Sequence, residues 1–128
     1  PKLGPKILLV DDDSIFGHIM ERKAAGRNLS FKYCSNPNEL DMDNPEAFDV
    51  TILDYDLGNV TGPQVVKALE QYFAAGPIVV VSNYSRLDTT SWPSAIKHYV
   101  AKDRGPDAIL DRALEVFDSR VRPEWALR

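Results

Sequence analysis

Residues 6–13 read KILLVDDD, so that an apolar run ends at three successive aspartates. A short and continuous apolar run is typical of a strand that is buried on both faces of a parallel sheet. Similar runs are Val50–Leu53 before Asp54, Ile78–Val81 before Ser82, and Tyr99–Ala101 before Lys102. Because parallel strands end at the same edge of a sheet, we expect the polar residues that follow them to lie close together.

Strand-like and helix-like segments alternate along the chain, which predicts an α/β fold with helices on both faces of a parallel sheet. Residues 63–76 and 106–122 carry apolar side chains at helical spacing. Residues 36–47 and 84–95 contain prolines and many short polar side chains, which predicts an irregular second and fourth helix. The expected strands are Lys6–Val10, Ser30–Cys34, Val50–Asp54, Ile78–Ser82 and Lys97–Ala101.

The first expected helix follows the three aspartates. Ser14 has a side chain suited to cap this helix, and Gly26 is suited to end it after about Ala25. Apolar residues at helical spacing predict its buried face, which comprises Ile15, Phe16, Ile19 and Met20.

The length of 128 residues fits one domain with a core of its own. The formal net charge of −4 argues against direct binding to nucleic acids, and no apolar stretch reaches the roughly 18 residues that span a membrane. Cys34 is the single cysteine, so we expect no internal disulfide and a thiol that fills the core. With no recognisable signal peptide, the composition predicts a cytoplasmic protein.

The residues at the strand ends form a chemically consistent set. Asp11, Asp12 and Asp54 would be neighbours if the first and third strands pair, and such carboxylates repel one another unless a cation lies between them. Mg²⁺ suits this position because it prefers oxygen ligands and often shares its coordination with a phosphate. A carboxylate is also a competent nucleophile toward phosphorus, and Lys102 and Ser82 are suited to stabilise a phosphoryl group.

Each of these residues also has an ordinary structural explanation. The three aspartates suit the positive end of the first helix, and Asp54 suits a turn after a strand. Ser82 and Lys102 are common residue types at a strand end and on a solvated surface. Their joint occurrence at four strand ends favours a site for Mg²⁺ and phosphate over a coincidence of separate roles.

Over essentially its full length, the chain resembles the receiver domain of bacterial two-component response regulators. The residues that carry the resemblance are Lys6–Asp13, Ile52–Leu57 followed by Gly62, Ile78–Ser82 and His98–Lys102. The resemblance implies a flavodoxin-like, doubly wound sheet of five parallel strands in the order 2-1-3-4-5. It also implies a receiver domain over residues 1–122, with residues 123–128 as a tail or the start of a linker.

The same resemblance implies roles for individual residues. Asp54 matches the aspartate that accepts a phosphoryl group, Asp12 the carboxylate that binds Mg²⁺ directly, and Asp11 its neighbour, which reaches the metal through water. The main-chain carbonyl of Asp56 would be a further metal ligand. The residues that match the phosphate-binding and switch positions are Ser82, Asn83, Tyr99 and Lys102.

The implied function is a phosphoacceptor switch, which is not an enzyme beyond its own phosphorylation and slow autodephosphorylation. The implied partners are a histidine kinase or histidine phosphotransfer protein and a downstream protein or fused output domain. The resemblance also allows a homodimer. Neither direct binding to nucleic acid nor contact with a membrane is expected.

Two other functions stay open at this point. Gly58 and Asp103 stand where the family usually has prolines, and Asn83 stands where it usually has alanine or glycine. Such departures are compatible with a pseudo-receiver that binds partners without being phosphorylated. The run Asp54-Tyr55-Asp56 also resembles the nucleophile and acid pair of haloacid-dehalogenase phosphatases. Those enzymes place this pair near the start of the chain, whereas here Asp11–Asp13 comes first.

Overall fold

The computed structural model describes residues 4–40, 48–68, 76–83 and 96–121. These residues form a five-stranded sheet in which every pair of neighbouring strands is parallel. The strands are β1 (Lys6–Val10), β2 (Ser30–Cys34), β3 (Val50–Asp54), β4 (Ile78–Ser82) and β5 (Ile96–Ala101). Their order in the sheet is β2-β1-β3-β4-β5, which confirms the expected order.

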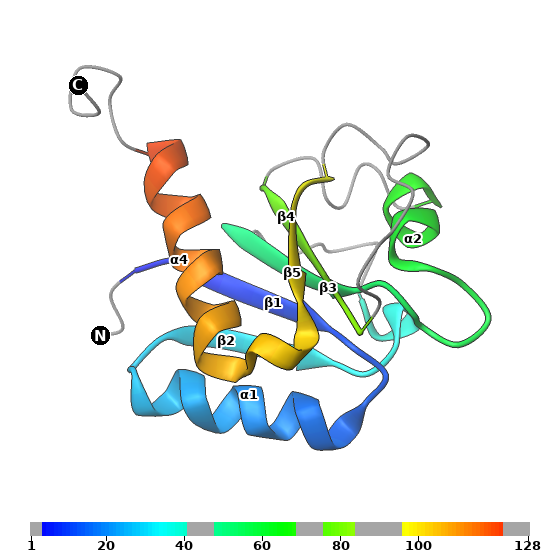
Figure 1. Cartoon of the computed structure of the whole chain (residues 1–128), viewed down its shortest axis with the longest axis horizontal. Helices are drawn as coiled ribbons and strands as arrows, with labels where there is room; N and C mark the ends of the chain where they lie inside the picture. The colour runs from blue at the N-terminus through cyan, green and yellow to red at the C-terminus, as the bar shows by residue number, and fades with distance from the viewer. Residues whose placement is uncertain (1–3, 41–47, 69–75, 84–95, 122–128) are drawn as a thin grey trace.

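Helices cover both faces of this sheet (Figure 1). The helices α1 (Ser14–Gly26) and α4 (Pro106–Val121) lie next to each other on one face, and α2 (Gly62–Ala68) packs on the other. Two short 3₁₀ helices, η1 (Pro37–Glu39) and η2 (Lys102–Arg104), follow β2 and β5. The short η1 agrees with the first part of the expected irregular second helix, whose remainder at residues 41–47 lies outside the described residues. The expected fourth helix falls at residues 84–95, outside the described residues.

The core has two parts, one on each face of the sheet. Alternate residues of the central strands point to opposite faces, as the period of a strand requires. The face under α1 and α4 buries Ile7, Leu9, Ile52, Val79 and Val81 against Met20 and Ile109. The face under α2 buries Leu8, Val10, Leu53 and Val80 against Val65 and Val66. The strands β1, β3 and β4 are therefore buried on both sides, which is why their sequences are continuously apolar.

The amino end of α1 differs from the sequence prediction. Asp13 caps this helix, and the prediction that Ser14 does so is wrong. The Oδ1 atom of Asp13 accepts two hydrogen bonds of 3.1 Å from the main-chain N–H groups of Ile15 and Phe16. An aspartate is a good cap because its carboxylate satisfies free N–H groups and also interacts favourably with the helix dipole.

The buried face of α1 is also not the predicted one. Met20 is buried as expected, but the other fully buried positions are Gly17 and Ala24. The side chain of Ile15 is 74% exposed and that of Ile19 is exposed as well, so the prediction that both lie in the core is wrong. Gly17 lies directly against the ring of Tyr33 on β2, which leaves no room for a side chain at this position of α1.

Other expectations about the core are confirmed within the described residues. Cys34 is buried. The residues Ile109, Leu110 and Ala113 of α4 are fully buried, and Leu114 and Phe117 are partly buried beside them. No helix in the described ranges is long and apolar enough to cross a membrane.

Candidate functional site

The carboxyl ends of β1 and β3 bring three aspartates together. The two strands are neighbours and pair Val10 with Leu53, so the residues that come next, Asp11 and Asp54, share one edge of the sheet. One carboxylate oxygen from each of Asp11, Asp12 and Asp54 lies within 4.8 Å of those of the other two. Asp11 and Asp54 are buried, at 0% and 5% exposure, whereas Asp12 is exposed. This cluster is a buried pair of carboxylates with a third at its mouth.

The three successive aspartates have divided roles. Asp13 caps α1, as described above, and its main-chain N–H donates a 2.8 Å hydrogen bond to Oδ1 of Asp11. Asp11 and Asp12 are left to face the end of β3. The capping explanation of this run is therefore correct for Asp13, whereas Asp11 and Asp12 as metal ligands stay a prediction.

The Lys102 side chain reaches the buried carboxylates from η2. Its Nζ atom lies 2.8 Å from Oδ2 of Asp11 and 3.8 Å from Oδ1 of Asp54, and only 9% of its side chain is exposed. The same Nζ atom lies 4.6 Å from the centre of the Phe16 ring, a cation–π contact that the sequence did not predict. The ammonium is thus held between the two buried carboxylates and the first turn of α1.

Burial and mutual repulsion shift the proton affinities of this cluster. Burial, followed by the negative charge of Asp11, raises the pKa of Asp54 to about 7. Burial also raises the pKa of Asp11, against the opposing effect of Lys102. Burial acts to lower the pKa of Lys102, but its contact with Asp11 and the charge of Asp54 outweigh this and raise it. One lysine therefore does not neutralise the buried acidic groups.

The donor atoms of the cluster fit a small divalent cation. All of them are carboxylate oxygens, which Mg²⁺ prefers. The Oδ2 atom of Asp11 is buried, and among the described residues it has no well-directed hydrogen bond, only the charge contact with Lys102. A buried carboxylate oxygen with an unused lone pair, close to two other carboxylates, is suited to bind a cation.

The loop after β3 is shaped by two glycines. Gly58 has a φ of +81°, which proline cannot adopt, and its N–H donates a 3.3 Å hydrogen bond to Oδ1 of Asp56. Proline therefore does not fit at position 58 of this loop. A Cβ atom at Gly62 would lie 2.6 Å from the main-chain oxygen of Asp54, so this position requires glycine because α2 starts directly against the strand end.

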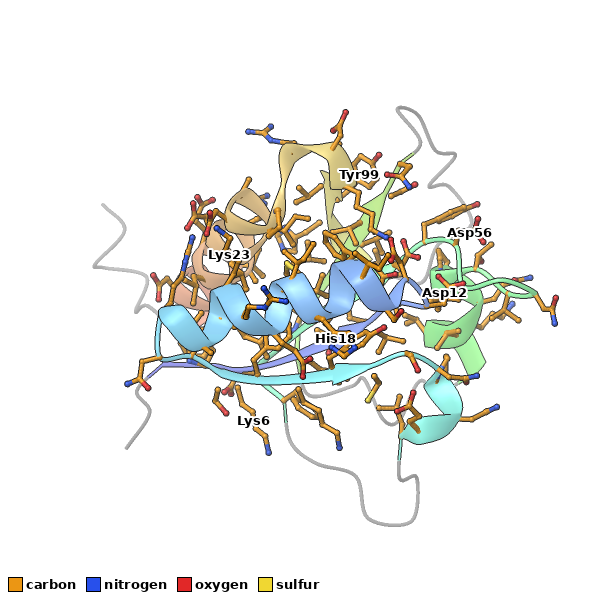
Figure 2. The ribbon with its side chains drawn as sticks, turned by 90° about the horizontal axis from the view of Figure 1, so that it is seen from below. Lys6, Asp12, His18, Lys23, Asp56 and Tyr99 are labelled. Atoms are coloured by element: carbon orange, nitrogen blue, oxygen red, sulfur yellow. The ribbon has the colours of Figure 1, made fainter. Side chains whose placement is uncertain are left out.

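Asp56 is exposed and lies at the same end of the molecule as Asp12. Figure 2 shows both near the start of α1, whereas Lys23 lies toward the far end of that helix. Asp56 is close enough for its charge to contribute to the raised pKa of Asp54. Its side chain is outside the group of three carboxylates, and its main-chain carbonyl as a metal ligand stays a prediction.

The remaining predicted site residues lie at the ends of β4 and β5. Ser82 is 2% exposed and directly follows Val81, which pairs with Asp54, so it occupies the same edge as the carboxylates. Asn83, the next residue, is exposed. Tyr99 pairs in register with Val80, two residues before the carboxyl ends of β4 and β5, and is 36% exposed. The structure thus brings Ser82 to the buried edge, while Tyr99 lies toward the outer surface of β5.

Tyr33 was not predicted as a site residue. Its hydroxyl donates a 2.8 Å hydrogen bond to the main-chain oxygen of Asp11. Burial and the charge of Asp11 raise the pKa of this phenol, so at neutral pH it stays a hydrogen-bond donor. The sequence shows Tyr33 as one of several residues in a strand of modest hydrophobicity, and nothing in its spacing indicates a contact with Asp11.

Comparison with known proteins agrees with this fold. The family model described as the response regulator receiver domain matches residues 7–114. The chain therefore belongs to the family of response regulator receiver domains of two-component systems.

Individual relatives show the extent of the similarity. The chain is 27% identical over 124 residues to the DNA-binding transcriptional regulator NtrC of Klebsiella pneumoniae. The match covers 92% of this chain and 26% of NtrC, so the chain spans about a quarter of that relative. A CheY-like receiver domain protein of Methanospirillum hungatei is 18% identical, with a TM-score of 0.78 over 91% of this chain and 96% of that one.

A further solved structure is that of the response regulator TrrA of Thermotoga maritima in complex with Mg²⁺ and BeF. It is 18% identical, with a TM-score of 0.71 over 87% of this chain and 97% of that one. At these identities the two structural neighbours establish the shared fold.

Proposed function

We propose that this chain is a phosphoacceptor switch in which Asp54 receives a phosphoryl group from a histidine kinase or a histidine phosphotransfer protein. The observation that carries the proposal is the position of Asp54, buried at the sheet edge with Asp11 and Asp12 within 4.8 Å and Lys102 3.8 Å away. A buried carboxylate surrounded by other acids and one lysine matches the needs of phosphoryl transfer, in which negative charge must be offset from several sides. Membership of the receiver family supports the same role.

Each side chain has its own proposed role in the phosphoryl transfer. A carboxylate oxygen of Asp54 attacks the phosphorus atom, the P–N bond of the phosphohistidine breaks, and the electron pair of that bond stays with the imidazole, which takes up a proton. Asp54 becomes an acyl phosphate. We expect Lys102 to pair with a phosphoryl oxygen and Ser82 to donate a hydrogen bond to another.

Asp11, Asp12 and Asp54, with the main-chain carbonyl of Asp56, would hold a Mg²⁺ ion. When bound, this ion offsets the charge of the carboxylates and of the transferring group. The fit of the donor set, described above, supports this assignment. The Mg²⁺ and BeF in the TrrA structure belong to that protein, and they support the proposal through the shared fold.

The new dianionic group then changes the affinity for a partner. Ser82 and Asn83 at the end of β4 and Tyr99 on β5 are the residues that we expect to reposition around it, as a shift between two populations. The partners that we propose are the phosphodonor and a downstream protein or fused output domain. A second copy of this chain, in a homodimer, is a further proposed partner. We also propose that the domain slowly hydrolyses its own acyl phosphate and acts on no separate substrate. We propose the cytoplasm as its location.

Mass spectrometry after treatment with a small phosphodonor and Mg²⁺ tests the proposal. We expect a gain of one phosphate on the native chain, and none on Asp54→Asn or on the native chain without Mg²⁺. A chain that stays unmodified under all conditions would instead be a pseudo-receiver. The residues that support this alternative are Asn83 and Asp103, which differ from those usual in the family. Release of many phosphates per chain would point to a phosphatase.

A further inference from the structure

The start of the loop that carries the acidic pair is held to β2 by a main-chain hydrogen bond of 3.1 Å from the N–H of Asp11 to the oxygen of Cys34 and by the side chain of Tyr33. The hydroxyl of Tyr33 donates a 2.8 Å hydrogen bond to the main-chain oxygen of Asp11. Asp11 lies two residues before Asp13, the N-cap of α1, so this bond fixes the backbone at the turn between strand and helix. Tyr33 is half-buried and its ring comes from the strand that pairs with β1.

Two residues of α1, Gly17 and His18, pack against the ring of Tyr33. A Cβ atom at Gly17 would overlap the ring, so the absence of a side chain on α1 makes the space that the ring fills. The ring of His18 meets it edge to face, with centroids 5.7 Å apart. A bulky residue on β2 and a glycine on α1 together place the phenolic hydroxyl directly at the loop.

The orientation of the Asp11 carboxylate depends on the backbone at this point. Its Oδ1 atom accepts a 2.8 Å hydrogen bond from the N–H of Asp13, and its Oδ2 atom is the buried oxygen next to Lys102. A change in the Asp11 peptide would rotate both oxygens and move the neighbouring Asp12. Groups that orient metal ligands in this way typically affect metal affinity without touching the metal.

We propose that Tyr33 is a positioning residue of the cation site, which acts by holding the main chain of Asp11 so that the carboxylates of Asp11 and Asp12 converge with that of Asp54. The inference rests on the proposed function for the existence of the cation site. It adds a residue from β2, a strand that contributes no carboxylate to the cluster.

The test compares two single-bond deletions at opposite ends of β1. Tyr33→Phe removes the hydroxyl and keeps the ring over Gly17. Asp49→Ala removes the acceptor of the 2.7 Å hydrogen bond from the N–H of Lys6, at the other end of the strand, and is the matched control. Mg²⁺ affinity is measured by calorimetric titration of the full chain, and hydrogen exchange of the Asp13 amide is measured without metal.

We expect Tyr33→Phe to bind Mg²⁺ about 3- to 10-fold more weakly than the native chain, the range for the loss of one ordinary hydrogen bond. The Asp13 amide should exchange several-fold faster, because its acceptor on Asp11 is no longer held in place. Asp49→Ala should leave both the Mg²⁺ affinity and the exchange rate of the Asp13 amide within about 2-fold of native, because a hydrogen bond lost far from the site is not coupled to it.

Gly17→Ala reaches the same contact from α1, since it retains the hydroxyl but displaces the ring, and it should also weaken Mg²⁺ binding. Tyr33→Phe with native affinity and native Asp13 exchange would overturn the inference. Equal weakening in Asp49→Ala would also overturn it, because the effect would then be a general loss of stability. If the native chain itself binds no Mg²⁺, the proposed function fails, and the exchange of the Asp13 amide alone decides whether Tyr33 holds the loop.

Discussion

The ammonium of Lys102 lies 2.8 Å from Oδ2 of Asp11. Oδ1 of Asp54, the proposed acceptor, is 1.0 Å farther away at 3.8 Å. Without a metal, therefore, the lysine mainly neutralises Asp11, and a cation bound to Asp11 would compete with it for the same carboxylate. Such competition would leave Lys102 available for a phosphoryl group on Asp54.

Substitution of Lys102 by methionine tests this competition. Lys102→Met retains much of the side-chain volume but leaves two buried carboxylates without their lysine. We expect the metal-free chain to lose about 3–5 kcal/mol of stability at pH 8, the range for breaking a buried ion pair. Mg²⁺ should bind more tightly than to the native chain, since its competitor is gone, and acceptance of phosphate should slow. Urea unfolding and calorimetric titration give the two values.

Lys23→Met is the control for this substitution. Lys23 is half exposed on α1 and pairs with Asp107 at 3.4 Å, so its loss should cost less than about 1 kcal/mol and leave Mg²⁺ binding unchanged. Weaker Mg²⁺ binding in Lys102→Met would contradict the competition.

The pKa of about 7 for Asp54 predicts how stability depends on pH. The folded chain holds this proton to higher pH than the unfolded chain, whose carboxyl releases it near pH 4. Stability should therefore fall as the pH rises from about 4 to 7 and stay lower above that range. The raised pKa of Asp11 acts in the same direction.

Thermal unfolding in the presence of a chelator measures this effect. Between pH 5.5 and pH 8, the native chain should lose stability on the order of 2 kcal/mol more than Asp54→Asn, which has no carboxyl at this position. Saturating Mg²⁺ should reduce the difference, because the cation stabilises the ionised form. Parallel pH profiles for the native chain and Asp54→Asn would show that Asp54 does not have the raised pKa.

Gly17→Ala should destabilise the chain, although alanine is the better helix former by about 1 kcal/mol. The added Cβ atom would overlap the ring of Tyr33, so either the ring or the helix must move. We expect a net loss of about 1–3 kcal/mol in urea unfolding. Gly26→Ala, at the open end of the same helix, meets no atom within 4 Å and should be neutral or stabilising. Similar stabilities of the two variants would mean that the ring adapts without cost.

Gly58→Pro restores the residue that the family usually has in the loop after β3. We expect it to destabilise this chain by about 1–3 kcal/mol, because proline fixes φ near −65° and the observed φ is +81°. Proline also lacks the N–H that donates to Asp56. Gly58→Ala separates the loss of this hydrogen bond from the strain of the backbone, since alanine keeps the N–H but is also strained at positive φ. A proline variant as stable as the native chain would show that the loop readily adopts another conformation.

The apolar runs and their polar end residues were enough to predict the sheet, because strands that are buried on both faces leave a clear pattern in the sequence. The same reasoning predicted that Asp11, Asp12 and Asp54 meet, since parallel strands end at one edge. It did not identify Asp13 as the helix cap, because Ser14 beside it is also a good cap and only the backbone geometry distinguishes them.

The sequence by itself therefore determined the order of the elements and the chemical character of the site, since both follow from local patterns of burial and charge. Only the tertiary structure decided which face of α1 meets the sheet, leaving Ile15 exposed and Gly17 buried under Tyr33. It also decided that the ammonium of Lys102 lies closer to the carboxylate of Asp11 than to that of Asp54. The physical reason is that helical spacing shows which residues share a face, but the space left by side chains from distant segments determines which face is covered.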